Sequence, residues 1–169
     1  MRVCFQDEQI YVGSRSLWKA DTGKNDFWNS YYWANLVSDN QEGLEKLVRN
    51  FPFCVFGESY GNVPSFKYDC EHGERKFRVF DILDMSTNKW LNPQAMIDIC
   101  ENFKIPCVPL LYHGPFSFEK VLELAEGKSA LNNKHVREGV VVSPAQDRNT
   151  DRGQRVKLKC VGLGYFEAK

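Results

Sequence analysis

The sequence lacks net charge, long apolar runs and paired-cysteine motifs, and each absence argues against a class of protein. Lysine plus arginine and aspartate plus glutamate both number 22, so overall charge does not indicate a nucleic-acid or membrane partner. No apolar run approaches the roughly 20 residues needed to cross a bilayer. The N-terminus also has no signal-peptide pattern. We therefore expect a soluble, cytoplasmic protein with no membrane partner.

The six cysteines form no Cys-x-x-Cys pair. Most lie in apolar stretches such as FPFCVFG and VKLKCVG, which is typical of reduced, largely buried thiols. The spacing of Cys70 and His72 is a weak indication of zinc without a second pair. His113 and His135 have no ligand spacing and are better explained as surface or hydrogen-bonded residues. The sequence therefore predicts no zinc site.

The length of 169 residues suits one globular unit with a sizeable core. Although the whole chain is neutral, residues 134–169 contain eight basic and four acidic side chains. That local excess is consistent with a phosphate-binding surface, and equally with a solvated one.

Strands and helices are mixed along the chain. Apolar runs at 2–5 and 10–15 flank the polar turn QDEQ, which predicts an antiparallel hairpin. Asn92 with Pro93, and also Ser117, are good helix starts. The other patterns predict helices at 25–37, 43–51, 93–103 and 118–127, the start of one in GYFEAK, and strands at 53–61, 76–83, 105–115, 138–144 and 154–162. Prolines indicate that the strand at 105–115 is short and at an edge.

Two predicted strands have faces of different character. Alternation divides KFRVFDIL into two faces, Phe77, Val79 and Asp81 against Arg78, Phe80 and Ile82. It divides RVKLKC into a cationic face and an apolar core face, Arg155, Lys157 and Lys159 against Val156, Leu158 and Cys160. Because an ammonium is not buried without a partner, the cationic face must border water or an anionic ligand.

Further conspicuous side chains lie at strand ends. Glu58 stands between glycines in FGESYG, Glu138 heads REGVVV, and Arg15 ends VGSR. Phe80 lies on a strand between them. Together with the lysines, these residue types suggest a nucleotide cleft, in which lysines bind phosphates, a carboxylate binds ribose hydroxyls or a metal, and a ring stacks on a base.

The order of these segments resembles the covalent nucleotidyltransferase superfamily of ATP-dependent ligases and mRNA capping enzymes. It is most similar to the RNA ligase family of phage and related sequences. VGSRS looks like the segment that follows motif I of the family, FGESYG like motif III, FRVFDIL like motif IIIa, REGVVV like motif IV and RVKLKCVG like motif V. The resemblance spans nearly the whole chain. It implies an α+β, ATP-grasp-like nucleotidyltransferase domain over residues 1–169, with antiparallel sheets and flanking helices that form a nucleotide-binding cleft.

The resemblance also implies a reaction. In this family a lysine amine attacks the α-phosphate of ATP, AMP passes to an RNA 5′-phosphate, and a 3′-hydroxyl displaces AMP to seal the RNA ends. The cofactors would be ATP and Mg²⁺ or Mn²⁺, and the partners RNA ends. Carried over by position, the implied roles are phosphate or RNA-end contact for Arg15, ribose contact for Glu58, stacking on adenine for Phe80, metal binding for Glu138 and α-phosphate binding for Lys157 and Lys159.

The sequence departs from the family pattern at motif I. No Lys-x-Asp/His-Gly segment precedes the hairpin, and Lys19 does not match it, so no nucleophile is nominated. We expect a chain truncated before Met1, whose parent has an N-terminal ATP-binding piece and a C-terminal RNA-binding domain. As given, the chain is expected to form no covalent adenylate and to bind ATP only weakly.

Two alternatives stay open. One is a DNA ligase or capping-type nucleotidyltransferase, and the other a non-catalytic nucleotide- or RNA-binding module. An RNA-stacking surface is conceivable from five aromatic residues, but helical spacing favours a core role for Trp18, Trp28, Tyr31, Tyr32 and Trp33. The loop that contains Arg148, Arg152 and Arg155 is consistent with a clamp for pyrophosphate or RNA, or with solvated surface.

Overall fold

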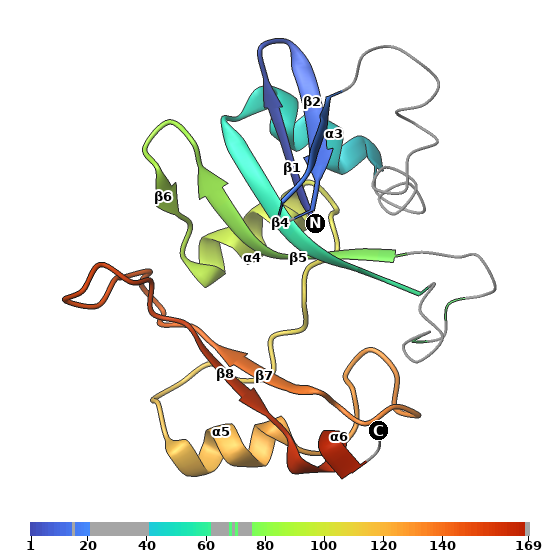
Figure 1. Ribbon diagram of the computed structural model, residues 1–169, viewed down its shortest axis with the longest axis vertical. Coiled ribbons are helices and arrows are strands. Elements are labelled where there is room, and N and C mark those ends of the chain that lie inside the picture. Colours follow the sequence, from blue (N-terminus) through green and yellow to red (C-terminus); the bar gives the residue numbers. More distant parts are fainter. Residues whose placement is uncertain (15, 21–40, 62–67, 69, 71–75, 168–169) are drawn as a thin grey trace. The chain divides into compact units, whose positions relative to one another are not determined.

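The computed structural model describes residues 1–14, 16–20, 41–61, 68, 70 and 76–167. The chain divides into two compact units, Met1–Val108 and Pro109–Lys169 (Figure 1). Each unit combines antiparallel strands with helices, so the predicted α+β class is confirmed. Among the described residues, no helix is long and apolar enough to cross a membrane.

The first unit is built on a six-stranded antiparallel sheet in the order β3-β2-β1-β4-β5-β6 (Figure 1). Its strands are β1 (Arg2–Gln6), β2 (Gln9–Gly13), β3 (Trp18–Ala20), β4 (Phe53–Tyr60), β5 (Lys76–Asp84) and β6 (Lys89–Trp90). The predicted hairpin is β1 and β2. Its turn residues Asp7 and Glu8 both have positive φ, 49° and 62°, as in the type I′ turn that suits the twist of the flanking strands.

Two helices cover one face of this sheet, α3 (Gln41–Asn50) and α4 (Pro93–Asn102). Both carry apolar residues at helical spacing, and α4 begins at the predicted Asn92–Pro93 pair, although the Asn92 side chain makes no capping hydrogen bond. The helices and the sheet share one apolar core, whose buried members include Val3, Val12, Val55, Val79 and Ile82 from strands and Leu44, Leu47, Val48, Met96 and Cys100 from helices. The two described helices of this unit therefore pack on the same face of the sheet.

The second unit is smaller. Its elements are α5 (Phe118–Ala125), β7 (Gly139–Val142), β8 (Leu158–Val161) and α6 (Leu163–Glu167). The strands β7 and β8 form a two-stranded antiparallel sheet, against which α5 packs. The helix expected to start in GYFEAK is α6.

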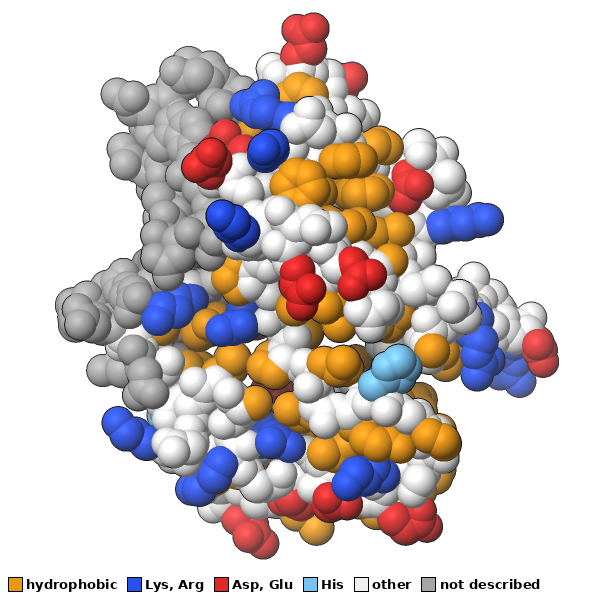
Figure 2. Space-filling model, turned by 180° about the vertical axis from the view of Figure 1, so that it is seen from behind, with side chains coloured by type: hydrophobic (Ala, Val, Ile, Leu, Met, Phe, Trp, Pro, Cys, Tyr) orange, Lys and Arg blue, Asp and Glu red, His pale blue; other side chains and the backbone are white. Residues whose placement is uncertain are grey.

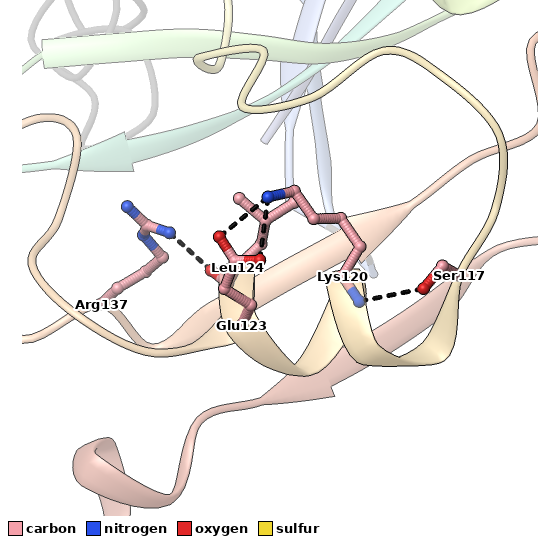
Figure 3. A network of polar contacts seen from close by, with 5 residues as sticks. All are labelled: Ser117, Lys120, Glu123, Leu124 and Arg137. Atoms are coloured by element: carbon pink, nitrogen blue, oxygen red, sulfur yellow. Dashed lines mark hydrogen bonds and ion pairs between the residues drawn. The ribbon is translucent and has the colours of Figure 1, made fainter.

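Both ends of α5 are capped by side chains, as Figure 3 shows. The Ser117 Oγ accepts a hydrogen bond from the Lys120 N–H at 3.2 Å, as predicted for an N-cap. At the other end, the Arg137 guanidinium donates to the carbonyl oxygens of Leu124 at 2.5 Å and Lys128 at 2.8 Å. A cation also complements the helix dipole at this end. Arg137 therefore has a structural role, anchoring the segment that leads to Glu138.

Two strand predictions were too long. The segment at 105–115 forms only a single parallel bridge, between Cys107 and Val79, because Pro106 and Pro109 have no N–H to continue a ladder. The strand expected at 154–162 is reduced to Leu158–Val161. The helix predicted at 25–37, with Trp28, Tyr31, Tyr32 and Trp33, lies outside the described residues, and so does His72.

Candidate functional site

In the first unit, the predicted site residues Glu58 and Phe80 lie on the sheet face opposite α3 and α4. On β4 the side chains alternate, so the fully buried Val55 faces the helices and Glu58 faces away from them. Glu58 is exposed and stands opposite Arg78 in the strand register. Its carboxylate is therefore accessible to a ligand.

A β-bulge determines where Phe80 points. In the register of β4 with β5, Phe56 pairs with Asp81 and Gly57 pairs with Val79, which leaves Phe80 as the extra residue. The aromatic side chain is 39% exposed. Bulges kink a strand and re-aim a side chain, and they are common beside active sites. Here the bulge presents a large aromatic side chain on the same face as Glu58.

The bulge also corrects the predicted faces of KFRVFDIL. Strict alternation put Val79 and Ile82 on opposite faces, but both are fully buried in the core. The extra residue at Phe80 shifts the alternation by one position, so Ile82 returns to the helix-covered face. The prediction is correct up to Phe80 and wrong beyond it.

The first glycine of FGESYG, Gly57, is required by the close approach of β4 and β5. A Cβ built on Gly57 would lie 2.1 Å from the Cζ atom of Phe77 and 2.6 Å from the carbonyl oxygen of Arg78. No larger residue fits beside the bulge without moving the β5 backbone. The glycine therefore allows the close strand approach that positions Glu58 and Phe80.

In the second unit, Glu138 and Lys159 form an ion pair. The Lys159 Nζ lies 2.6 Å from the Glu138 Oε1, and both side chains are about half exposed. The two residues come from different segments of the chain, the entry to β7 and the middle of β8. The structure thus brings together Glu138 of REGVVV and Lys159 of RVKLKC.

Gly139 permits the approach of these two segments. Its φ of +152° is unfavourable for a residue with a side chain, and a Cβ there would lie only 2.0 Å from the carbonyl oxygen of Cys160. Directly beside it, the Gly162 N–H donates to the Glu138 carbonyl at 2.9 Å. The backbone at Glu138 is therefore tied to the end of β8.

The predicted faces of RVKLKC are only partly correct. Leu158, expected in the core, is 53% exposed, because a sheet of two strands with one helix cannot bury both of its faces. Lys157 is half-buried and Lys159 exposed. Arg155 lies outside β8 and is paired with Asp147, Nε to Oδ1 at 2.6 Å, with both side chains mostly buried. Arg155 therefore fastens the loop rather than extending a cationic face along the strand.

The predicted site residues thus fall into two groups. Glu58 and Phe80 belong to the first unit, and Glu138, Lys157 and Lys159 to the second. Arg15 lies outside the described residues. Each described member is at least partly accessible, as a ligand contact requires.

The Glu138 carboxylate suits a hard divalent cation. Mg²⁺ and Mn²⁺ prefer oxygen ligands, and Mg²⁺ in nucleotide sites is commonly held by one or two carboxylates, substrate phosphates and water. Within the described ranges, no three His, Cys, Asp or Glu side chains gather as an all-protein metal site would require. A cation at Glu138 would therefore need further oxygen ligands, such as nucleotide phosphates or water.

One residue that sequence reasoning missed is Arg2. Its guanidinium carbon lies 3.9 Å from the ring centroid of Trp18, on the same sheet face as Glu58 and Phe80. The alternation of side chains along the predicted strand could have indicated its position, because Arg2 precedes the buried Val3 and therefore lies on the opposite face.

Comparisons with known proteins agree with the motif order. A family model described as RNA ligase matches residues 1–161. No curated protein sequence matches the chain at the significance required.

The fold is similar to solved structures of Naegleria gruberi RNA ligase. A lysine-to-alanine variant with ATP and Mn has a TM-score of 0.70 and 24% identity, over 99% of this chain and 48% of that one. The ligase with PPi has a TM-score of 0.69 at 24% identity, over 99% and 47%. A lysine-to-methionine variant with AMP and Mn has a TM-score of 0.70 at 24% identity, over 99% and 48%. The chain therefore spans about half the length of these ligases.

Proposed function

Because the chain belongs to the RNA ligase family, we propose that it is the nucleotide-binding domain of an ATP-dependent ligase that joins RNA ends. The domain would bind ATP with Mg²⁺ or Mn²⁺ and form part of an enzyme that links an RNA 5′-phosphate to a 3′-hydroxyl. The N. gruberi ligase structures with ATP, AMP, PPi and Mn support a nucleotide and a metal as ligands.

The observation that carries the proposal is the Glu138–Lys159 pair. A carboxylate and an ammonium lie 2.6 Å apart on neighbouring strands, half exposed, and their backbone is fixed by the close approach at Gly139. Nucleotidyl transfer depends mainly on positioning and on charge stabilisation, which such fixed groups supply. A purely structural surface pair would contribute at most about 1 kcal/mol to folding and would need no such backbone device.

Each described residue has a definite role in the proposal. Phe80 stacks on adenine and Glu58 accepts hydrogen bonds from the ribose hydroxyls, since both are accessible on one sheet face. Lys157 and Lys159 bind the α-phosphate. Glu138 would hold the divalent cation, which supplies charge neutralisation at the phosphates. Arg15, which lies outside the described residues, completes these assignments as a contact to a phosphate or to the RNA end.

The 169 residues contain no Lys-x-Asp/His-Gly motif for the nucleophile. We therefore expect this chain to bind ATP without forming a covalent lysine-AMP adduct. RNA sealing is proposed for the whole protein, together with an N-terminal segment and a C-terminal RNA-binding domain as its further parts.

The test is ATP binding by the chain and by a Phe80→Ala variant, measured by titration calorimetry with Mg²⁺ or Mn²⁺. We expect the wild type to bind ATP and Phe80→Ala to bind about tenfold more weakly, because base stacking on an aromatic ring contributes about 1–3 kcal/mol. Phe116→Ala is the matched control, since Phe116 is an exposed aromatic residue outside the proposed site.

Two results would contradict the proposal. One is an absence of ATP binding by the wild type, and the other is equal ATP affinity of the wild type and Phe80→Ala. Intact-mass measurement of the same ATP mixtures checks the missing nucleophile, because an AMP adduct on a lysine would refute that part.

A further inference from the structure

We propose that Arg2 is a further nucleotide-binding residue, a phosphate contact on the first unit that no motif of the chain predicts. The inference rests on the proposed function and extends the site formed by Glu58 and Phe80. It follows from three observations, namely the position of Arg2 in the sheet, the stacking of its guanidinium and the state of its Nε atom.

The position follows from the strand register. Arg2 on β1 pairs with Phe56 on β4, and Phe56 stands opposite the bulge that contains Phe80 on β5. Arg2 and Phe80 are therefore two strands apart on one face, a separation of about 10 Å at the usual strand spacing. This is comparable to the reach from the base of an extended nucleotide to its phosphates. A base stacked on Phe80 can place its phosphates at Arg2.

The guanidinium is held in place by an aromatic ring. Its central carbon lies 3.9 Å from the centroid of the Trp18 ring, and Trp18 pairs in register with Gly13, the β2 partner of Arg2. Stacking of this kind restrains a planar guanidinium while leaving its edges able to donate hydrogen bonds. Trp18 thus orients Arg2 before any ligand binds.

The Nε atom of Arg2 is buried and has no hydrogen-bond partner among the described residues. An unpaired donor of a charged group is costly to bury, so it calls for an acceptor. The side chain as a whole is only half-buried, which leaves access from the sheet face. A phosphate presents several acceptor oxygens to the fork of a guanidinium and satisfies this need.

Two other arginines of the first unit show the contrast. Arg78, which stands opposite Glu58, already donates to the Tyr60 hydroxyl at 3.1 Å and to the Cys107 carbonyl at 2.9 Å. Arg49 on α3 lies over the Phe5 ring at 5.1 Å, but it is exposed and belongs to a helix on the other side of the sheet. Arg78 is therefore a structural residue, and Arg49 provides a control for the loss of one cation above an aromatic ring.

The experiment compares the binding of ATP and of adenosine by Arg2→Gln, Arg2→Lys and the control Arg49→Gln, using titration calorimetry on the full chain. We expect Arg2→Gln to bind ATP roughly tenfold more weakly, since a hydrogen bond to a charged group is lost, and to bind adenosine like the wild type. Arg2→Lys keeps the charge and should bind ATP with intermediate affinity. Arg49→Gln should bind both ligands like the wild type.

The outcomes separate this inference from the proposed function. If Phe80→Ala weakens ATP binding but Arg2→Gln and Arg2→Lys do not, the inference is overturned and the proposed function stands. Equal losses for ATP and adenosine would mean that Arg2 only supports the sheet, and would also overturn it. If the wild type binds no ATP, both fail. Should Arg2→Gln not fold, as judged by circular dichroism, the ratio of ATP to adenosine affinity in Arg2→Lys decides.

Discussion

The two units hold their proposed site residues by different physical means. In the first unit, a six-stranded sheet and two helices bury a continuous apolar core, and a bulge in that sheet presents Phe80. In the second unit, Ala125 is the only apolar side chain among the described residues that is buried. Apolar side chains lie beside lysines and arginines in the lower half of Figure 2. The exposed apolar residues of the second unit include Val141, Leu158, Leu163 and Phe166.

The second unit compensates with polar contacts. The Arg137 guanidinium caps α5, the Glu126 carboxylate accepts hydrogen bonds from the Leu163 and Gly164 N–H groups at the start of α6, and Asp147 binds Arg155. The difference teaches that sites in one chain can be rigid for different reasons. Burial of apolar side chains stabilises the first unit, whereas close backbone packing and hydrogen bonds stabilise the second. Substitutions of the same kind should therefore change the stability of the two units by different amounts.

The largest expected effect is the loss of a core side chain in the first unit. Ile82→Ala removes a fully buried side chain and should lower the free energy of unfolding by about 3–4 kcal/mol, whereas the matched Leu158→Ala in the second unit should cost less than about 0.5 kcal/mol. Urea denaturation of both variants measures the difference. Similar costs at the two positions would mean that burial does not distinguish the units.

The next effect concerns the backbone of the second unit. Gly139→Ala should lower its stability by about 2–3 kcal/mol, because the added Cβ would lie 2.0 Å from the Cys160 carbonyl oxygen at a φ of +152°. The control is Gly153→Ala, which also has positive φ but no atom within 4 Å of the added Cβ, and it should cost only about 1 kcal/mol. Hydrogen exchange of β7 and β8 should rise selectively in Gly139→Ala. Unchanged exchange there would refute the role of Gly139 in fixing Glu138.

The smallest effect tests the polar contacts. Asp147→Asn breaks an ion pair whose side chains are only 18% and 17% exposed, and it should destabilise the second unit by about 1–2 kcal/mol. Glu123→Gln breaks the more exposed Lys120–Glu123 pair and should cost less than about 0.5 kcal/mol. Thermal unfolding of both variants, monitored by circular dichroism, measures the difference. An equal response of the two variants would show that burial of the Asp147 pair is unimportant.

Local signals predicted much of the fold. The QDEQ turn, the Asn92–Pro93 start of α4 and the Ser117 cap of α5 all depend on neighbouring residues, and the structure confirms each of them. The strands that contain Glu58 and Phe80, and the strand that directly follows Glu138, were also predicted, because their apolar patterns are read within a few residues.

Non-local contacts decided what the patterns could not predict. The bulge at Phe80 depends on the register with β4, and the exposure of Leu158 depends on how few elements cover β8. Arg155 was predicted beside the lysines, but Asp147 binds it from eight residues away and closes the loop. Each of these outcomes is set by a partner elsewhere in the chain, which periodicity in one segment does not contain.

The sequence by itself determined the family and the types of side chain available to a nucleotide, because motif order and residue chemistry are carried by the chain. Only the tertiary structure decided which of these side chains meet or share a face. In the folded chain, Lys159 forms an ion pair with Glu138, and Arg2 lies on the sheet face that carries Phe80. Arg78 and Arg137 instead donate hydrogen bonds to backbone carbonyl oxygens. The physical reason is that a charged group acquires its role from the acceptors and rings that folding brings to it.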